Sequence, residues 1–505
     1  MTTPRRVDVL VIGAGPTGLT AAGDLARSGR SVVVLERWPN VNPSSRAFAT
    51  MARTLEVLDA RGLADDVLAK SHRAPGVSIF AGARIDLTHL RSEFQFVAIT
   101  PQTNVDHALA GYATSQGADI LRGVEVVALE QDSDGVTVTA RPKDDDDPDH
   151  RVTWRADYVI GADGAHSTAR DLLGVDFPGK TILSSIVLAD VKLADGAGDG
   201  GLTLASSRER FAFLAPYGRG DDDGAWYRTM VWERSHQVPD TEPVDPVEVI
   251  DVLNRAMGRD VGVREVGWLS RFHCDERQVA QYRYGRVFLA GDAAHVHSPM
   301  GGQGMNTGIQ DAANLAWKID AVLAGAPDDV LDTYHAERHP IGKRVLVQSG
   351  LMARGVTLRP RIARGMRNLI APRLLRRPRV RDTVAGSFAG TELRYPHEHG
   401  QDRLVGTRAT EIPLLQAKLT HLQRSSGFVL IREHGAEPVG VPGLVETERA
   451  EAGPAVLVRP DGYIAWVGES SDRDGWMTVL RRWLGSALSN SRPDRSMSGT
   501  PTQKA

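Results

Sequence analysis

A glycine-rich turn near the N-terminus constrains this chain more than any other feature. Gly13-Ala-Gly15-Pro16-Thr17-Gly18 follows a β-branched apolar run, Val7 to Ile12, and precedes a stretch with helical spacing, Thr17 to Ser28. The first glycine permits a tight turn, the second lets the backbone approach a pyrophosphate, and the third lets helix and strand pack closely. The N–H groups that open such a helix bind phosphate.

A carboxylate after the next apolar run completes the pattern. Glu36 closes the run Ser31 to Leu35 and stands 18 residues beyond Gly18, where an acidic side chain binds ribose hydroxyls. Continuous β-branched runs are typical of strands buried on both faces of a parallel sheet. Together these features predict a dinucleotide site on an α/β fold.

Two later segments favour FAD over NAD in that site. They are Gly161-Ala-Asp163-Gly164 and Gly291-Asp292-Ala-Ala-His295, and the second continues into Pro299-Met-Gly301-Gly302-Gln303-Gly304-Met305-Asn306. A carboxylate at a strand end can hold the hydroxyls of a ribityl chain. A glycine-rich loop at a helix N-terminus presents N–H groups to the pyrimidine edge of a flavin. Nicotinamide needs no polyol anchor of this kind.

Changes of pattern along the 505 residues predict several domains. Short alternating strands replace the nucleotide-type pattern from Thr181 to Phe272, and strand-like runs return near Phe428, Ala455 and Tyr463. Helical stretches are expected over 50–69, 104–116 and 475–484. We expect a discontinuous FAD-binding domain (1–75, 100–180 and 275–350), a substrate-binding sheet domain (76–99 and 181–274), a helical linker (351–390), a C-terminal domain (391–488) and a disordered tail (489–505).

Composition excludes several classes of protein. One cysteine, Cys274, rules out an intrachain disulfide or a thiolate metal cluster and fits the cytoplasm. No stretch reaches the ~20 apolar residues that span a bilayer, and a net charge of −3 gives no reason to expect nucleic acid or a membrane as partner. The basic stretch Arg359 to Arg381 lacks interleaved aromatic residues, which favours a solvated helical linker.

The motif order resembles that of the flavoprotein aromatic hydroxylases with the para-hydroxybenzoate hydroxylase fold (group A FAD monooxygenases). Within them it is similar to the branch that acts on polyketide antibiotics and includes rifampicin monooxygenase. The resemblance covers roughly residues 5 to 350. Leu457-Val-Arg-Pro-Asp-Gly-Tyr-Ile-Ala-Trp466 is similar to the thioredoxin-like C-terminal domain of that branch. The implied fold is a Rossmann-like FAD domain, an inserted β-sheet substrate domain and a thioredoxin-like domain without a CxxC pair, with a structural or dimerisation role.

The resemblance also implies contacts for individual residues. Glu36 and Arg37 would hold the adenosine ribose and a nearby phosphate, Arg46 would lie beside the flavin or its phosphates, and Gln102 would contact the ribityl region. Val126 would contact adenine through its backbone, and Asp292 the ribityl chain or pyrophosphate. Gly304, Met305 and Asn306 would line the isoalloxazine edge, with Pro299 over the ring. Asp163 and Arg170 belong to a segment shared between FAD and nicotinamide nucleotide, and a structural role suits them equally.

The implied activity is an NAD(P)H- and O2-consuming hydroxylation of an aromatic small molecule, of the phenolic polyketide type, in antibiotic biosynthesis or modification. It would proceed through a flavin C4a-hydroperoxide, stabilised by backbone donors near Gly301 and Gly302, with no side-chain nucleophile and no metal. NADPH and NADH are both compatible, as are a monomer and a homodimer. His295 and His297 are expected to serve packing and hydrogen bonding, and Cys274 to be a buried thiol.

Alternatives remain open at this point. A Baeyer–Villiger monooxygenase on the same fold would carry the same FAD motifs. A flavin-binding protein without turnover would not need the Gly301 to Asn306 loop, which stabilises a reactive reduced flavin. A flavin-dependent halogenase is disfavoured because the chain has no Trp-x-Trp-x-Ile-Pro segment.

Overall fold

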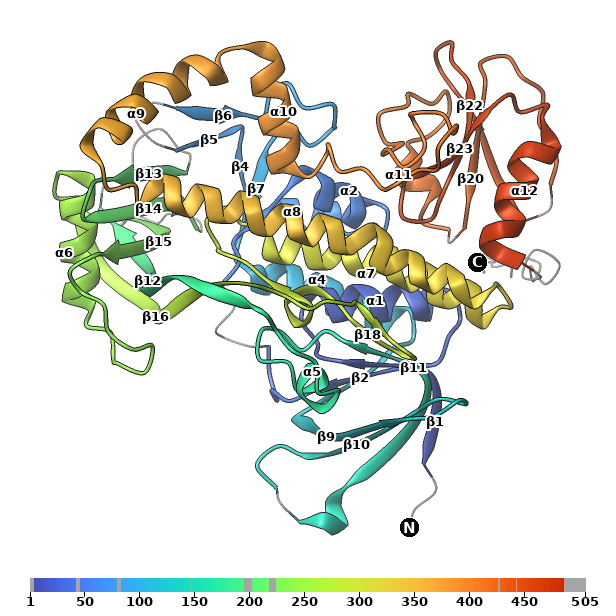
Figure 1. Cartoon of the computed structure of the whole chain (residues 1–505), viewed down its shortest axis with the longest axis horizontal. Coiled ribbons are helices and arrows are strands. Elements are labelled where there is room, and N and C mark those ends of the chain that lie inside the picture. Colours follow the sequence, from blue (N-terminus) through green and yellow to red (C-terminus); the bar gives the residue numbers. More distant parts are fainter. Residues whose placement is uncertain are drawn as a thin grey trace, which may run out of the picture.

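A computed structural model describes residues 4–41, 46–79, 83–145, 147–194, 202–217, 224–425, 427–441 and 443–485. Three regions are visible in Figure 1, with two sheet regions joined by long helices and a separate C-terminal unit beside them. The tail predicted over 489–505 lies outside the described residues. In the part of the chain that is described, no helix is both long and apolar enough to cross a membrane.

The first region is an eight-stranded sheet whose central strands are parallel. β1 pairs in parallel with β2 and β11, β2 with β8, and β11 with β18, while β9 and β10 add an antiparallel extension. Val9, Leu10 and Val11 of β1 are fully buried, as continuous β-branched runs predict. The strands are β1 (Arg5–Ile12), β2 (Val32–Glu36), β8 (Asp119–Arg122), β9 (Val124–Gln131), β10 (Val136–Pro142), β11 (Val152–Gly161), β17 (Arg283–Tyr284) and β18 (Val287–Leu289).

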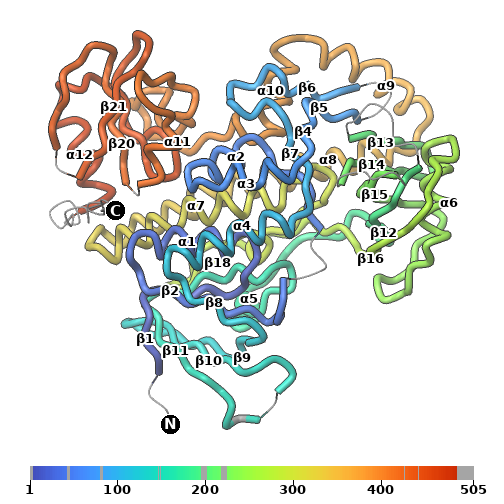
Figure 2. The backbone as a smooth tube through the Cα atoms, turned by 180° about the vertical axis from the view of Figure 1, so that it is seen from behind, coloured from blue at the N-terminus to red at the C-terminus, as the bar shows by residue number. Residues whose placement is uncertain are grey.

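Helices pack on this sheet, and the Gly13 turn leads into the first of them. α1 (Pro16–Arg27) lies against α4 (Gln102–Ser115) and α7 (Gly304–Leu323) (Figure 2). The helix expected over 50–69 is instead two helices, α2 (Ala52–Asp59) and α3 (Ala64–Ala69), because the chain turns between them at Gly62, whose φ is +74°. Short elements complete the region: η1 (Pro148–His150), α5 (Thr168–Leu172), η2 (Gly291–Ala293) and η3 (Asp328–Leu331).

The second region is built on a six-stranded sheet. Two long antiparallel strands, β12 (Gly179–Leu193) and β16 (Val263–Gln278), run from the first region to the far end of this sheet. β16 also pairs with β19 through Arg277 and Val296, so the second sheet reaches the loop before α7. The other elements are β13 (Thr203–Ser206), β14 (Arg210–Pro216), β15 (Ala225–Glu233), β19 (His295–Val296), α6 (Pro246–Met257), and the small strands β3 (Ala49–Thr50), β4 (His72–Ala74), β5 (Gly76–Ser78), β6 (Arg84–Asp86) and β7 (Val97–Ile99).

The C-terminal unit is a four-stranded sheet with a helix. The order is β21-β20-β22-β23, with β20 parallel to β21 and antiparallel to β22. The three predicted strands are present, as β20 (Val429–Arg432), β22 (Ala455–Val458) and β23 (Ile464–Gly468), and the predicted helix is α12 (Arg473–Leu484). The sequence pattern did not predict β21 (Val445–Glu448) or α11 (Leu419–Leu422). β21 carries two glutamates, which hide its strand character.

Three helices connect the first two regions to this unit. They are α8 (Asp332–Val356), α9 (Arg361–Leu375) and α10 (Pro378–Ala389), and the segment 351–390 contains the end of α8 together with α9 and α10. α8 carries a proline, Pro340, in its interior.

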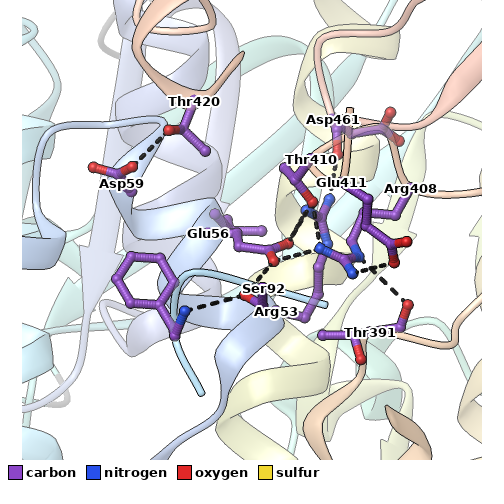
Figure 3. A network of polar contacts seen from close by, with 12 residues as sticks. Arg53, Glu56, Asp59, Ser92, Thr391, Arg408, Thr410, Glu411, Thr420 and Asp461 are labelled. Atoms are coloured by element: carbon purple, nitrogen blue, oxygen red, sulfur yellow. Dashed lines mark hydrogen bonds and ion pairs between the residues drawn. The ribbon is translucent and has the colours of Figure 1, made fainter. Parts of the chain in front are cut away.

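Buried charges tie the C-terminal unit to α2. Arg408 donates to the Glu56 carboxylate at 2.5 Å, and Arg53 binds both Glu56 at 3.0 Å and the carbonyl of Asp461 at 2.6 Å (Figure 3). Arg53, Glu56 and Arg408 are all buried. Removal of one partner from such a buried ion pair would destabilise the protein, because it would leave a charge buried without a counter-ion.

Candidate active site

One cavity of about 770 Å³ extends from the Gly13 turn to the second sheet. Its walls include the turn before α1, the ends of β2 and β9, the loop before α7, and Phe272 to Asp275 of β16. The volume is at the upper end of the range for ligand pockets. Most of the predicted site residues meet in this wall: Gly13, Gly15, Pro16, Thr17, Glu36, Arg37, Arg46, Gln102, Val126, Asp163, Arg170, Asp292, Pro299, Gly302, Gly304 and Met305.

The start of α1 opens into this cavity. Gly15 is the N-cap, and no side chain caps the helix or places an acid in its first turn. A Cβ added to Gly15 would meet no atom within 4 Å, so this backbone faces open space. Gly13 has φ +102°, and a Cβ there would lie 2.5 Å from the Ala162 carbonyl oxygen. Unpaired N–H groups and the positive helix end suit a diphosphate.

Gly18 lies outside the cavity wall and has a packing role. A Cβ at this position would lie 2.0 Å from the Gly13 carbonyl oxygen and 3.2 Å from Val11 Cγ1. The residue therefore allows α1 to approach β1, as its place in the motif predicts.

Glu36 is held in place by backbone donors. Its two carboxylate oxygens accept from Ala14 N–H at 2.7 Å and Trp38 N–H at 2.9 Å. These bonds tie the end of β2 to the glycine turn and leave the remaining lone pairs for a ligand. Arg37 and Val126 lie in the same part of the wall.

Asp163 and Arg170 have structural contacts in the wall. The Asp163 carboxylate accepts from Ser167 Oγ at 2.5 Å and Ala169 N–H at 3.0 Å, at the start of α5. Burial raises the pKa of this carboxyl, although these hydrogen bonds oppose the rise. Arg170 donates to the carbonyls of Ala165 and Ala293, which joins the α5 segment to η2.

The loop before α7 differs from the prediction in its hydrogen bonding. The N–H groups of Gly301 and Gly302 both donate to the Pro299 carbonyl, at 2.7 Å and 2.9 Å. Both N–H groups are therefore occupied within the loop in this structure, and the stabilisation of a reactive oxygen species by backbone donors near these glycines stays a prediction. Gly301 is also absent from the cavity wall, whereas Pro299, Gly302, Gly304 and Met305 are part of it.

The Asn306 side chain also has a different role from the expected one. Its amide group donates to the carbonyls of Ala49 and Gly302, and its oxygen accepts from Met51 N–H at 2.8 Å. The side chain is buried and does not line the cavity. It fixes the loop against β3 and so positions Gly304 and Met305.

His297 presents an unpaired acceptor in the cavity wall. Its Nδ1 lies 3.0 Å from the Ser298 carbonyl, so it carries the hydrogen, and the buried Nε2 has no hydrogen-bond partner among the described residues. Burial lowers the pKa of this imidazole, which keeps it neutral. His295 stacks beside it with ring centroids 6.5 Å apart and bonds Asp311 at 2.7 Å. His295 therefore serves packing and hydrogen bonding, as expected.

The remaining wall residues were missed by sequence reasoning. Several come from β16 or the segment before it, where no motif marks them and only the coordinates bring them to the flavin-type loop. Cys274, expected as a buried thiol, is 2% exposed, and burial raises its pKa to about 12. The missed residues include Trp38, Phe48, Asp106, Arg122, Glu125, Asp240, Phe272, His273, Asp275 and Arg277.

Comparison with known proteins identifies the family. Residues 6–349 match the FAD-binding domain family, and residues 402–487 match the C-terminal domain of aromatic-ring hydroxylases. This chain belongs to the FAD-dependent aromatic-ring hydroxylases. The hydroxylase is 35% identical to 12-dehydrotetracycline 5-monooxygenase/anhydrotetracycline 6-monooxygenase of Streptomyces rimosus, over 95% of this chain and 99% of that one. It is 36% identical to the rifampicin monooxygenase of Streptomyces venezuelae, with the same coverage.

A solved structure agrees with this membership. The anhydrotetracycline hydroxylase OxyS from Streptomyces rimosus superposes with a TM-score of 0.81 at 35% identity, covering 95% of this hydroxylase and 99% of that chain. The predicted fold class and the assignment as an FAD-dependent aromatic monooxygenase are confirmed.

The chemical groups in the cavity wall of the hydroxylase match the parts of FAD. The open start of α1 suits the diphosphate, Glu36 suits a ribose, and the Asp292 carboxylate, which no described residue hydrogen-bonds, suits a polyol. The orphaned Nε2 of His297 requires a donor from a bound molecule or water.

Proposed function

We propose that this hydroxylase inserts oxygen into a phenolic, multi-ring aromatic compound, with NADPH or NADH as electron donor. The observation that carries the proposal is the single cavity, which joins a diphosphate-type helix start to the second sheet. A bound flavin and the aromatic ring would therefore share one cavity. Relatives named for tetracycline and rifampicin substrates support a polyketide-type compound.

The side chains would divide the work along the cavity. The start of α1 would bind the diphosphate, Glu36 and Arg37 the adenosine end, and Gln102 and Asp292 the ribityl chain. Gly304 and Met305 would line the isoalloxazine edge, under Pro299. Bound FAD would supply the redox chemistry, which takes two electrons from the nicotinamide donor and splits O2 between product and water.

The protein's own contribution is orientation and exclusion of water. Phe48, Phe272, Val296 and Met305 give the inner part of the cavity an apolar lining. Water in the pocket would otherwise promote loss of the activated oxygen as hydrogen peroxide before it reaches the substrate, so a dry pocket favours coupled turnover. No side chain needs to act as nucleophile.

The test follows flavin reduction under anaerobic conditions. The FAD-loaded protein is mixed with NADPH or NADH, with and without a panel of phenolic polyketides and rifamycins, and loss of the oxidised flavin absorbance is timed. We expect one compound to accelerate reduction many-fold. Admission of O2 should then yield a product that gains one oxygen atom.

Structure determination of that product separates the chemical outcomes. A new hydroxyl on an aromatic ring supports the proposal. A ketone converted to an ester would replace it with Baeyer–Villiger oxidation. Failure of both nucleotides to reduce the flavin with any compound in the panel would count against an NAD(P)H-dependent hydroxylase.

A further inference from the structure

The large apolar side chains of α9 face the solvent instead of the protein interior. None of its 15 residues is buried, although the helix carries six large apolar side chains, and five of these are exposed. Their exposed fractions are high, at 81% for Ile362, 55% for Met366, 56% for Leu369, 43% for Ile370 and 39% for Leu374. A helix in a water-facing position normally turns such residues inward. An outward apolar strip of this kind marks an interaction site.

The inner face of α9 is held by polar contacts instead. Arg367 donates to the Gly355 carbonyl at 2.5 Å and reaches Ser206 Oγ at 3.5 Å. Arg364 is half-buried beside it, and burial together with that neighbouring charge lowers the pKa of Arg367. The strip is therefore fixed outward by the way the helix is anchored.

Arginines lie at both ends of the apolar strip. Arg361 and Arg373 lie on α9, and Arg376, Arg377 and Arg379 follow it, all exposed. None of these five makes an ion pair with a carboxylate of the described chain, whereas Arg381 pairs with Asp382 at 2.8 Å. The segment from Arg359 to Arg381 contains no acidic residue, although the whole chain has a net charge of −3. The positive charge of Arg361, Arg373, Arg376, Arg377 and Arg379 is therefore concentrated in this one part of the chain.

α9 lies at the margin of the molecule. In both views it forms the outer edge beyond β5 and β6, away from the C-terminal unit (Figures 1 and 2). Nearby α8 also exposes Val347 and Leu351, by 53% and 61%. The exposed apolar side chains of α9 therefore belong to an element at the periphery of the molecule.

The charge decides between possible occupants. A second copy that met this face by two-fold symmetry would bring the two arginine clusters together, since such an interface uses the same patch twice. An anionic bilayer complements both features, because its headgroups bind arginine and its acyl boundary accepts apolar side chains. We propose that α9 and the arginines after it form a docking surface for anionic lipid membranes.

The docking would be peripheral and reversible. One helix of 15 residues lying in the interface buries only its apolar strip, and the arginines add an electrostatic attraction that salt screens. The net charge of the whole chain gave no reason to expect a membrane as partner, because a net charge does not reveal a local cluster of arginines.

The experiment is vesicle co-sedimentation of the FAD-loaded full-length protein. Vesicles contain phosphatidylcholine alone or with about 30 mol% phosphatidylglycerol, at about 0.1 M and about 0.5 M salt. We expect binding to the anionic vesicles at low salt and at least about tenfold weaker binding at high salt or to neutral vesicles.

Two variants test the surface itself. One combines Arg373→Gln, Arg376→Gln, Arg377→Gln and Arg379→Gln, and the other combines Ile362→Ser, Leu369→Ser and Ile370→Ser. Each should weaken partitioning at least about tenfold. Val247→Ser on α6, where the side chain is 67% exposed, and Arg403→Gln should not change it. All four proteins should keep the wild-type melting temperature and FAD content, because the altered residues are exposed.

Three results would overturn the proposal. The first is no binding to anionic vesicles. The second is binding that both surface variants retain. The third is a dimer in analytical ultracentrifugation that the serine variant disperses, since this would assign the strip to a second copy of the chain.

Discussion

At the scale of single residues, Gly13 and Gly29 form a natural comparison. Both have positive φ, at +102° and +84°, but only Gly13 lies against other backbone, while a Cβ at Gly29 would meet nothing within 4 Å. We expect Gly29→Ala to lower the free energy of unfolding by about 1 kcal/mol, the cost of the left-handed backbone alone. Gly13→Ala should abolish FAD retention, because the new methyl group meets the Ala162 carbonyl. The flavin-to-protein ratio measures FAD retention, and the melting temperature reports the change in stability. Equal FAD content in the two variants would contradict this account.

His297 provides a second residue-scale prediction. His297→Leu removes the unpaired Nε2, so FAD should bind about tenfold more weakly, the loss of roughly one hydrogen bond. Because its pKa is lowered by burial, the ring is neutral at pH 7 and gains a proton only below its ordinary value of 6.5. Protonation turns the acceptor into a donor, so wild-type affinity should fall as the pH drops below that value.

Fluorescence titration of the apoprotein with FAD at pH 7.5 and pH 5.5 tests this. Asp292, His295 and Asp311 are the other titratable groups that face the ring. They are shared by wild type and the leucine variant, which isolates the contribution of His297. An affinity that falls equally in both proteins would assign the pH effect elsewhere.

The sequence predicted which residues form the site better than it predicted the hydrogen bonds that these residues make. The motif brought Gly301, Gly302 and Asn306 to the correct loop. Their N–H and amide groups are nevertheless used within the protein, by Pro299, Ala49 and Met51. A sequence states which donors exist, whereas the loop conformation decides which of them remain available. The β16 residues Phe272 to Asp275 carry no motif, so only tertiary structure places them in the cavity.

At the scale of elements, α7 and α8 share a buried charge cluster. Lys318 of α7 lies 2.8 Å from the Glu337 carboxylate of α8, which also binds Arg459 at 2.6 Å. Burial alone would raise the pKa of Glu337, but Arg459 and Lys318 hold it at about 2, against an ordinary 4.5. The stabilisation is therefore complete above pH 4.5 and is lost as the pH falls toward 2.

Glu337→Gln should remove much of this pH dependence. At pH 7 the variant leaves Lys318 and Arg459 short of a counter-ion, which costs about 3–5 kcal/mol. Melting temperatures from pH 7 down to pH 2.5 should converge with those of wild type at the acid end. Glu398→Gln, in the exposed pair with Arg482, serves as control and should follow the wild-type curve. A constant difference between wild type and Glu337→Gln at every pH would contradict the assignment.

Elements with a strong pattern were predictable and weakly patterned ones were not. β1, β2, α1 and the β22–β23 hairpin follow from apolar periodicity and turn residues. β21 was missed because Val445-Glu-Thr-Glu gives no apolar alternation. The outward strip of α9 could not be read from spacing, since periodicity identifies an apolar face without saying which way it points.

At the scale of the whole molecule, the contact between the C-terminal unit and α2 should be cooperative. Arg408→Met leaves Glu56 buried with one fewer partner, so we expect a loss of about 3–5 kcal/mol and early release of the C-terminal unit. Calorimetry should show a separate low-temperature transition, and limited proteolysis should cut first in the segment after α10.

An exposed ion pair between the C-terminal unit and the segment before β7 provides the control. Lys418 and Glu93 are 2.8 Å apart and about half exposed, so Lys418→Met should cost less than about 1 kcal/mol. If both variants melt in one transition at the same temperature, the buried network does not hold the two parts together.

The turn at Pro460-Asp461-Gly462 has a consequence for recombination among relatives. Asp461 and Arg459 bond Asn314 and Glu337, on the helices α7 and α8, and α7 begins at the cavity. A crossover placed between α10 and β20 would join an α7 from one parent to counter-ions from another. Chimeras built to exchange substrate preference should therefore inherit α7, α8 and the 459–461 turn from a single parent.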